Sequence, residues 1–81
     1  MNRKPITLDL INQLADGIVT EPALVRWPDG DVGVMPFLIN RESADPGTVI
    51  ATQEDYWTYC DGQDDAEQRA NFAADIALSE G

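Results

Sequence analysis

The sequence predicts an α+β fold: a three-stranded antiparallel β-meander with a short N-terminal helix and C-terminal helices packed on it. Three observations support this class. Two apolar runs flank the turn sequence 28–31 (PDGD), which predicts a β-hairpin. Segment 48–52 (TVIAT) is short and β-branched, which predicts a third strand. Segments 7–15 and 64–79 place capping residues before apolar residues at helical spacing. With 81 residues, we expect one domain, 1–81, with a modest core.

The first helix is predicted over Thr7–Ala15. Thr7 suits the N-cap, and Asp9 lies in the first turn, where the helix dipole favours an acid. Gly17 can adopt the left-handed conformation that ends a helix. Leucine and isoleucine share one side of the segment, so we expect that side to face the core.

The two strands of the hairpin are predicted at 23–27 and 32–39. Val32 and Val34 then share one face of the second strand, and Pro36 predicts a local bulge or bend. Segment 40–47 (NRESADPG) is predicted to be a loop. We expect the third strand to pair with the second, as in a meander.

For segment 52–60 the sequence allows two secondary-structure predictions. Thr52 suits an N-cap, and Asp55 at the third helical position completes a shortened capping box, so a helix is favoured. The alternative is that the third strand continues through Tyr59, because aromatic residues also favour strands.

The last helix shows the clearest start signal, with Asp64 as predicted N-cap and Glu67 at the third position. Asp65 and Arg69 are spaced to form an ion pair four residues apart. A stripe of small residues is expected to let this helix lie close to the sheet. The stripe consists of Ala66, Ala70, Ala73 and Ala77.

Charge is the strongest compositional signal. Fifteen acids against five bases give a net charge of −10. Such a chain lacks the basic patch that releases counterions from phosphates, so direct binding to nucleic acid or to anionic lipid is disfavoured. No apolar run is long enough to span a bilayer, and the N-terminal sequence does not resemble a signal peptide. The single Cys60 excludes an intrachain disulfide, which predicts a cytoplasmic protein.

Catalytic and metal-binding signatures are missing from the sequence. There is no histidine, and one cysteine cannot complete a structural zinc site. The acidic loops at 29–31 and 61–65 do not follow the alternating pattern of a calcium loop. Cys60 precedes an acid, which raises the pKa of a thiol and disfavours a reactive nucleophile. We therefore expect no enzyme activity and no cofactor.

The acid surplus is concentrated in residues 54–81, which hold eight acids and one arginine. Carboxylates one helical turn apart lie about 5–6 Å from each other, comparable to successive phosphates of a nucleic-acid strand. We therefore predict that acids of this segment bind a basic protein or nucleoprotein complex. The candidate residues are Glu54, Asp55, Asp61, Asp64, Asp65, Glu67 and Asp75.

In overall character the chain resembles the small acidic inhibitors of phages and mobile elements, namely anti-CRISPR proteins and other DNA mimics. The likeness rests on size, acidity, the lack of histidine and disulfide, and the acid run Asp61–Glu67 with Glu54 and Asp55. It includes no alignable motif. The resemblance implies an inhibitor that occupies the basic channel of a nucleic-acid-binding complex in the host cytoplasm.

The alternative prediction is a small structural or adaptor module that binds through aromatic side chains. The aromatic candidates are Trp27, Tyr56, Trp57 and Tyr59, of the residue types that anchor protein interfaces. A domain this small also needs aromatic residues in its core. Both hypotheses are compatible with a homodimer, because short helices would leave a sheet face uncovered.

Overall fold

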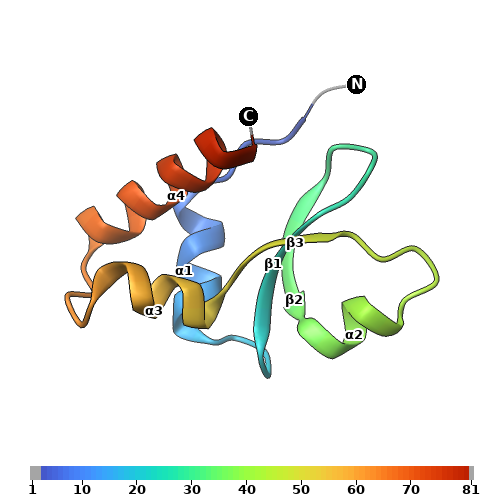
Figure 1. The fold of residues 1–81 in the computed structure, drawn as a ribbon, viewed down its shortest axis with the longest axis horizontal. Coiled ribbons are helices and arrows are strands. Elements are labelled where there is room, and N and C mark those ends of the chain that lie inside the picture. The colour runs from blue at the N-terminus through green and yellow to red at the C-terminus, as the bar shows by residue number, and fades with distance from the viewer. Residues whose placement is uncertain (1–2, 81) are drawn as a thin grey trace.

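The computed structural model describes residues 3–80. Its elements are α1 (Leu8–Asp16), β1 (Pro22–Arg26), β2 (Val32–Pro36), α2 (Phe37–Glu42), β3 (Thr48–Thr52), α3 (Gln53–Cys60) and α4 (Ala66–Glu80). Figure 1 shows α1, α3 and α4 grouped on one side of the strands, with α2 on the other side. The α+β class, the antiparallel three-stranded sheet and the helices packed on it are therefore confirmed. None of the helices within residues 3–80 is long and apolar enough to cross a membrane.

The strand order is β2-β1-β3, so the predicted meander is wrong. Both outer strands pair antiparallel with β1, and β3 lies beside β1 instead of β2. All five residues of β1 are buried, as expected for a central strand. In β2, by contrast, Gly33 and Pro36 are residue types that favour an edge. The connection 37–47 is also too long for a tight hairpin and crosses over β1.

Residues 37–42 form α2, where the sequence had predicted the end of a strand and the start of a loop. Pro36 ends β2 and stands at the N-cap of α2, because proline cannot donate a ladder hydrogen bond. The buried Asn40 then holds the following loop: its Nδ2 donates to the Gly47 carbonyl at 3.1 Å, and its Oδ1 accepts from the Gly47 amide at 2.9 Å. Gly47 lies against Val25 and the backbone of Arg26.

Both faces of the central strand are therefore covered. Leu24 belongs to the core beneath the helices, whereas Ala23 and Val25 are fully buried although they lie outside that cluster. Val32 and Val34, which were predicted to share one face of the strand, both pack against the helical core. Within residues 3–80, the central strand therefore offers no uncovered face of the kind from which a homodimer was expected.

The hairpin turn at 28–31 is confirmed. The amide of Trp27 donates to the carbonyl of Asp31, and the amide of Gly30 donates to the carbonyl of Trp27, both at 3.0 Å. The Asp29 carboxylate accepts from the Asp31 amide at 2.9 Å. Gly30 has a φ of 95°, which glycine adopts without steric cost.

The predicted caps of α1 and α3 are also confirmed. The Thr7 hydroxyl accepts from the amide of Leu10, and Gly17 adopts the left-handed conformation at the other end of α1. Thr52 and Asp55 form a reciprocal capping box, so the helical reading of segment 52–60 is correct.

Two details of α4 differ from the prediction. Asp65, not Asp64, caps the helix, because its carboxylate accepts from the amide of Gln68 at 2.8 Å. The predicted alanine stripe does not face the sheet, since three of its four members are exposed. The side of α4 that carries Phe72 and Ile76 is buried instead, and α4 packs mainly against α1. The buried residues of α4 are Phe72, Ala73 and Ile76.

Candidate functional site

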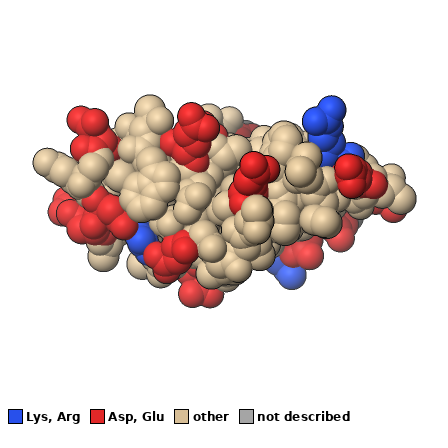
Figure 2. Space-filling view, turned by 90° about the horizontal axis from the view of Figure 1, so that it is seen from below, with Lys and Arg blue, Asp and Glu red and all other residues tan. Residues whose placement is uncertain are grey.

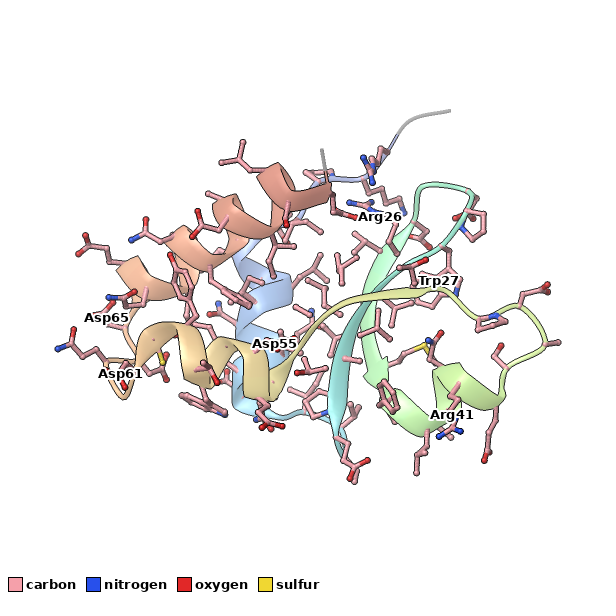
Figure 3. All side chains as sticks on the ribbon, in the orientation of Figure 1. Arg26, Trp27, Arg41, Asp55, Asp61 and Asp65 are labelled. Atoms are coloured by element: carbon pink, nitrogen blue, oxygen red, sulfur yellow. The ribbon has the colours of Figure 1, made fainter. Side chains whose placement is uncertain are left out.

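Acidic side chains gather where α3 meets α4. Asp61 ends α3 in the left-handed conformation, and Asp65 caps α4, so the chain reverses within a few residues. Figure 3 shows Asp61 and Asp65 at the same end of the molecule. Asp64 and Glu67 belong to this segment, and the fold adds Asp16 from the C-terminal end of α1. We call these five residues the acidic end.

Arg69 is the cation that joins the acidic end to the helices. Its Nε and Nη2 donate to the two oxygens of Asp64 at 2.7 and 2.8 Å, and Nη2 also donates to Asp16 at 3.0 Å. Its Nη1 donates to Asn12 Oδ1 at 3.0 Å. The predicted pair of Asp65 with Arg69 is therefore wrong: Asp65 is occupied as a cap, and Arg69 points toward α1.

Asp64 is bound on two sides. Besides the contacts from Arg69, it accepts a hydrogen bond of 2.5 Å from the hydroxyl of Tyr56, whose side chain is fully buried. The hydrogen bonds from Arg69 and Tyr56 lower the pKa of Asp64 to about 2. Burial, and then the bond to Asp64, raises the pKa of Tyr56. Asp64 is thus a structural anchor whose charge is already compensated by Arg69.

The other predicted site residues lie apart from the acidic end. Glu54 and Asp55 begin α3, about 10 Å of helix away from Asp61. Asp55 lies away from Asp61 in Figure 3, and its carboxylate is used in the capping box. Asp75 lies midway along α4 beside Tyr59, where a hydrogen bond raises the pKa of the tyrosine. The seven candidates therefore do not form one cluster, although four of them share one end.

Most of the bases, but few of the acids, form ion pairs within the chain. Within residues 3–80, four of the five bases pair with only four carboxylates, those of Asp16, Asp31, Asp64 and Glu80. Arg41 on α2 is the one base of that range without an ion pair, and Figure 3 shows it at the far side from the acidic end. Eleven carboxylates keep an uncompensated charge. Figure 2 shows acidic side chains gathered where α3 meets α4 and further ones spread along the same face.

The aromatic candidates separate into buried and exposed residues. Tyr56 is in the core, where its ring contacts Phe72 edge-on, and Trp27 is half-buried beside Gly33. Trp57 and Tyr59 are 41% and 38% exposed. Helical periodicity could have predicted this separation: Tyr56 and Cys60 share the buried side of α3, whereas Trp57 is turned about 100° around the helix from Tyr56.

The residues of the acidic end are better suited to binding a charged partner than to catalysing a reaction. Cys60 is buried, and its Sγ donates to the Trp57 carbonyl at 3.7 Å, which leaves the thiol inaccessible to a substrate. Within residues 3–80, no three cysteine or carboxylate side chains are grouped so that they could hold a metal ion. Carboxylates that lack counter-charges can instead attract a cationic surface. Comparisons with protein-family models, curated proteins and solved structures found no match, so a function has to be argued from this geometry.

Proposed function

We propose that the protein is a non-enzymatic inhibitor that binds the cationic surface of a nucleic-acid-binding protein or complex in place of the nucleic acid. This is the mode of action of anti-CRISPR proteins and other DNA mimics of phages, which act in the host cytoplasm. The observation that carries the proposal is the charge balance of the folded chain. Among residues 3–80, eleven carboxylates lack an ion-pair partner, whereas four of the five bases are neutralised by carboxylates of the same chain.

The acidic end is the proposed contact surface. Its residues come from the end of α1, the segment between α3 and α4, and the first turn of α4. The Arg69 hydrogen bonds hold α4 to Asn12 and Asp16 of α1 and to Asp64, so this part of the surface has a defined position. A rigid array costs little ordering entropy when it binds. Within residues 3–80, Asp61, Asp65 and Glu67 are the members without an ion pair. Because the Asp65 carboxylate also caps α4, Asp61 and Glu67 are the ones we expect a partner to contact directly.

A competition experiment tests the proposal. A panel of nucleic-acid-binding proteins and complexes is saturated with labelled DNA or RNA, and displacement by this protein is measured at low salt and at about 0.5 M salt. We expect displacement of one target at low salt and a steep loss at high salt, because screening weakens contacts between exposed charges.

Two matched double variants locate the surface. D61N/E67Q removes two charges from the acidic end, and asparagine tolerates the left-handed conformation of Asp61. E42Q/D45N removes two exposed charges at the opposite side of the sheet and is the control. We expect D61N/E67Q to weaken displacement about tenfold and the control to act like the parent. Equal effects, or displacement that ignores salt, would contradict the proposal.

The second candidate is a binding module that uses exposed aromatic side chains. It is favoured by the exposure of Trp57 on the outer side of α3. If W57L abolishes binding to a target that D61N/E67Q still binds normally, the aromatic module is the better description.

A further inference from the structure

The outward face of α3 combines an exposed aromatic ring with carboxylates on both sides. Glu54, Trp57 and Asp61 follow one another at intervals of three and four residues, so they line one side of the helix. Tyr56 and Cys60 face the core instead. The amide of Asp61 donates to the Trp57 carbonyl at 3.1 Å, which places Asp61 directly one turn beyond the tryptophan.

Within residues 3–80, no lysine or arginine forms an ion pair or a cation–π contact with this face. Within the described residues the one cation–π contact is that of Arg69 with Tyr56, at 5.9 Å from the ring centroid. Neither Glu54 nor Asp61 has an ion-pair partner among residues 3–80. The Trp57 ring packs against the Tyr56 ring at a centroid distance of 5.2 Å and a tilt of 56°, so its direction is constrained.

A groove continues the face at the N-terminal end of α3. It encloses about 370 Å³ and is lined by apolar Pro22 and Phe37 together with the carboxylates of Glu21 and Glu54. Glu21 also lacks an intrachain ion pair within residues 3–80. The groove therefore presents negative charge beside apolar surface, as the Trp57 face does.

We propose that this face docks an extended segment of the partner protein that carries two arginines three residues apart. One guanidinium lies at the groove between Glu21 and Glu54, and the other stacks on Trp57 next to Asp61. Glu54 and Asp61 are separated by about 10 Å of helix. Three residues of an extended polyproline II chain span about 9 Å and, because this conformation repeats every three residues, place both arginines on one side. This inference rests on the proposed function, because it names the kind of segment that the acidic protein recognises.

Arginine fits the face better than lysine. A planar guanidinium can stack on an indole ring while its edge donates hydrogen bonds to a carboxylate, whereas an ammonium group is more strongly hydrated. For exposed sites a cation–π contact contributes about 0.5–1 kcal/mol, which corresponds to about a two- to fivefold change in affinity.

The test is an NMR titration of the ¹⁵N-labelled protein with two capped hexapeptides, GRGGRG and GKGGKG. The chain has two tryptophans, so the indole N–H signal of Trp27 is an internal reference for that of Trp57. We expect the arginine peptide to shift the Trp57 signal selectively and to bind about two- to fivefold more tightly than the lysine peptide. W57L should abolish this preference, and W57F should keep part of it. E54Q/D61N should weaken both peptides, and E42Q/D45N should weaken neither.

Each outcome separates the two proposals. If both peptides bind alike and W57L changes nothing, the docking face is wrong, while loss of target displacement in D61N/E67Q would still support the proposed function. If the arginine peptide binds as expected but no nucleic-acid-binding target is displaced, the docking face stands and the proposed function fails. A folded W57L spectrum distinguishes lost binding from lost structure.

Discussion

Arg26 and Glu80, 54 residues apart in the chain, form a bidentate salt bridge that joins the central strand to the end of α4. The Arg26 Nε and Nη2 atoms donate to the two carboxylate oxygens of Glu80 at 3.0 and 2.8 Å. The Arg26 Nη1 atom donates to the carbonyls of Lys4 at 2.6 Å and Gly30 at 2.8 Å. One side chain of the central strand thereby holds the N-terminal segment, the hairpin turn and the end of α4 (Figure 3).

We predict that R26M lowers the free energy of unfolding by about 3 kcal/mol. The two side chains are 10% and 8% exposed. Removal of Arg26 leaves the buried Glu80 carboxylate with only the longer contact of 3.4 Å from the exposed Arg3. E80Q should cost less, because its amide oxygen still accepts a hydrogen bond. R41M is the control, since Arg41 is exposed without an ion pair within residues 3–80, and it should stay within about 0.5 kcal/mol of the parent. Urea unfolding followed by circular dichroism measures all three. Equal costs for R26M and R41M would contradict the role of the pair.

Asp64 makes stability depend on acid pH. Its pKa is about 2 in the folded chain, against about 4 in an unfolded chain. The stabilisation is complete above pH 4 and is lost as the pH falls toward 2, because protonation breaks the contacts with Arg69 and Tyr56. We predict that D64N is less stable than the parent at pH 7 and that the difference disappears near pH 2. Urea unfolding over this pH range provides the measurement, with D61N as a control. A constant difference between parent and D64N would show that the ion pair contributes nothing.

Asn40 fixes the crossover from β2 to β3 through the Gly47 peptide. We predict that N40A lowers the free energy of unfolding by about 1–3 kcal/mol, because buried backbone donor and acceptor groups lose their partners. N71A removes an exposed asparagine from α4 and should be neutral or slightly stabilising, since alanine favours a helix. Chemical denaturation of the two variants gives the comparison. If N40A is as stable as N71A, the amide pair is dispensable.

Gly47 is required by close approach to the central strand. A Cβ atom at this position would meet Val25 Cγ1 and would lie 2.9 Å from the carbonyl oxygen of Arg26. Backbone cannot yield as a flexible side chain does, so we predict that G47A lowers the melting temperature by several degrees, for a cost of about 1–3 kcal/mol. Thermal unfolding measures the effect. A melting temperature equal to that of the parent would show that the loop moves aside freely.

Asp65 allows the capping role to be separated from the charge. D65N and D65A remove the same charge, but asparagine caps a helix about as well as aspartate does. We predict that D65A costs about 1 kcal/mol of stability and that D65N costs a few tenths. If a basic target reads the charge, both variants weaken its binding equally. Binding that follows stability instead would show that Asp65 matters only as a cap.

Local signals in the sequence predicted most elements correctly. Thr7 and Thr52 begin their helices as expected, and the capping box with Asp55 decided the ambiguous segment in favour of a helix. The turn at 28–31 also formed as predicted. Each of these depends on hydrogen bonds between residues a few positions apart. The error of one residue at the start of α4 arose because Asp64 and Asp65 are both suitable caps, and Arg69 and Tyr56 bind Asp64.

The site was less predictable. The acid surplus of the C-terminal third was visible in the sequence, but the place of Asp16 in the acidic end, where it pairs with Arg69, was not. Local sequence patterns relate residues a few positions apart, so they could not predict the contact between Asp16 and Arg69, which are 53 positions apart. The exposure of Trp57 was accessible from helical periodicity, once Tyr56 is assigned to the core.

By itself the sequence determined the helices that begin at Thr7 and Thr52, the hairpin turn at 28–31 and the net charge of −10. Only the tertiary structure decided that β1 is central and buried on both faces, and which acids are neutralised. The physical reason is the sequence separation of the interacting residues. Caps and turns form hydrogen bonds between residues a few positions apart, whereas strand order and ion pairs involve residues far apart in the chain and depend on which arrangement buries the most apolar surface.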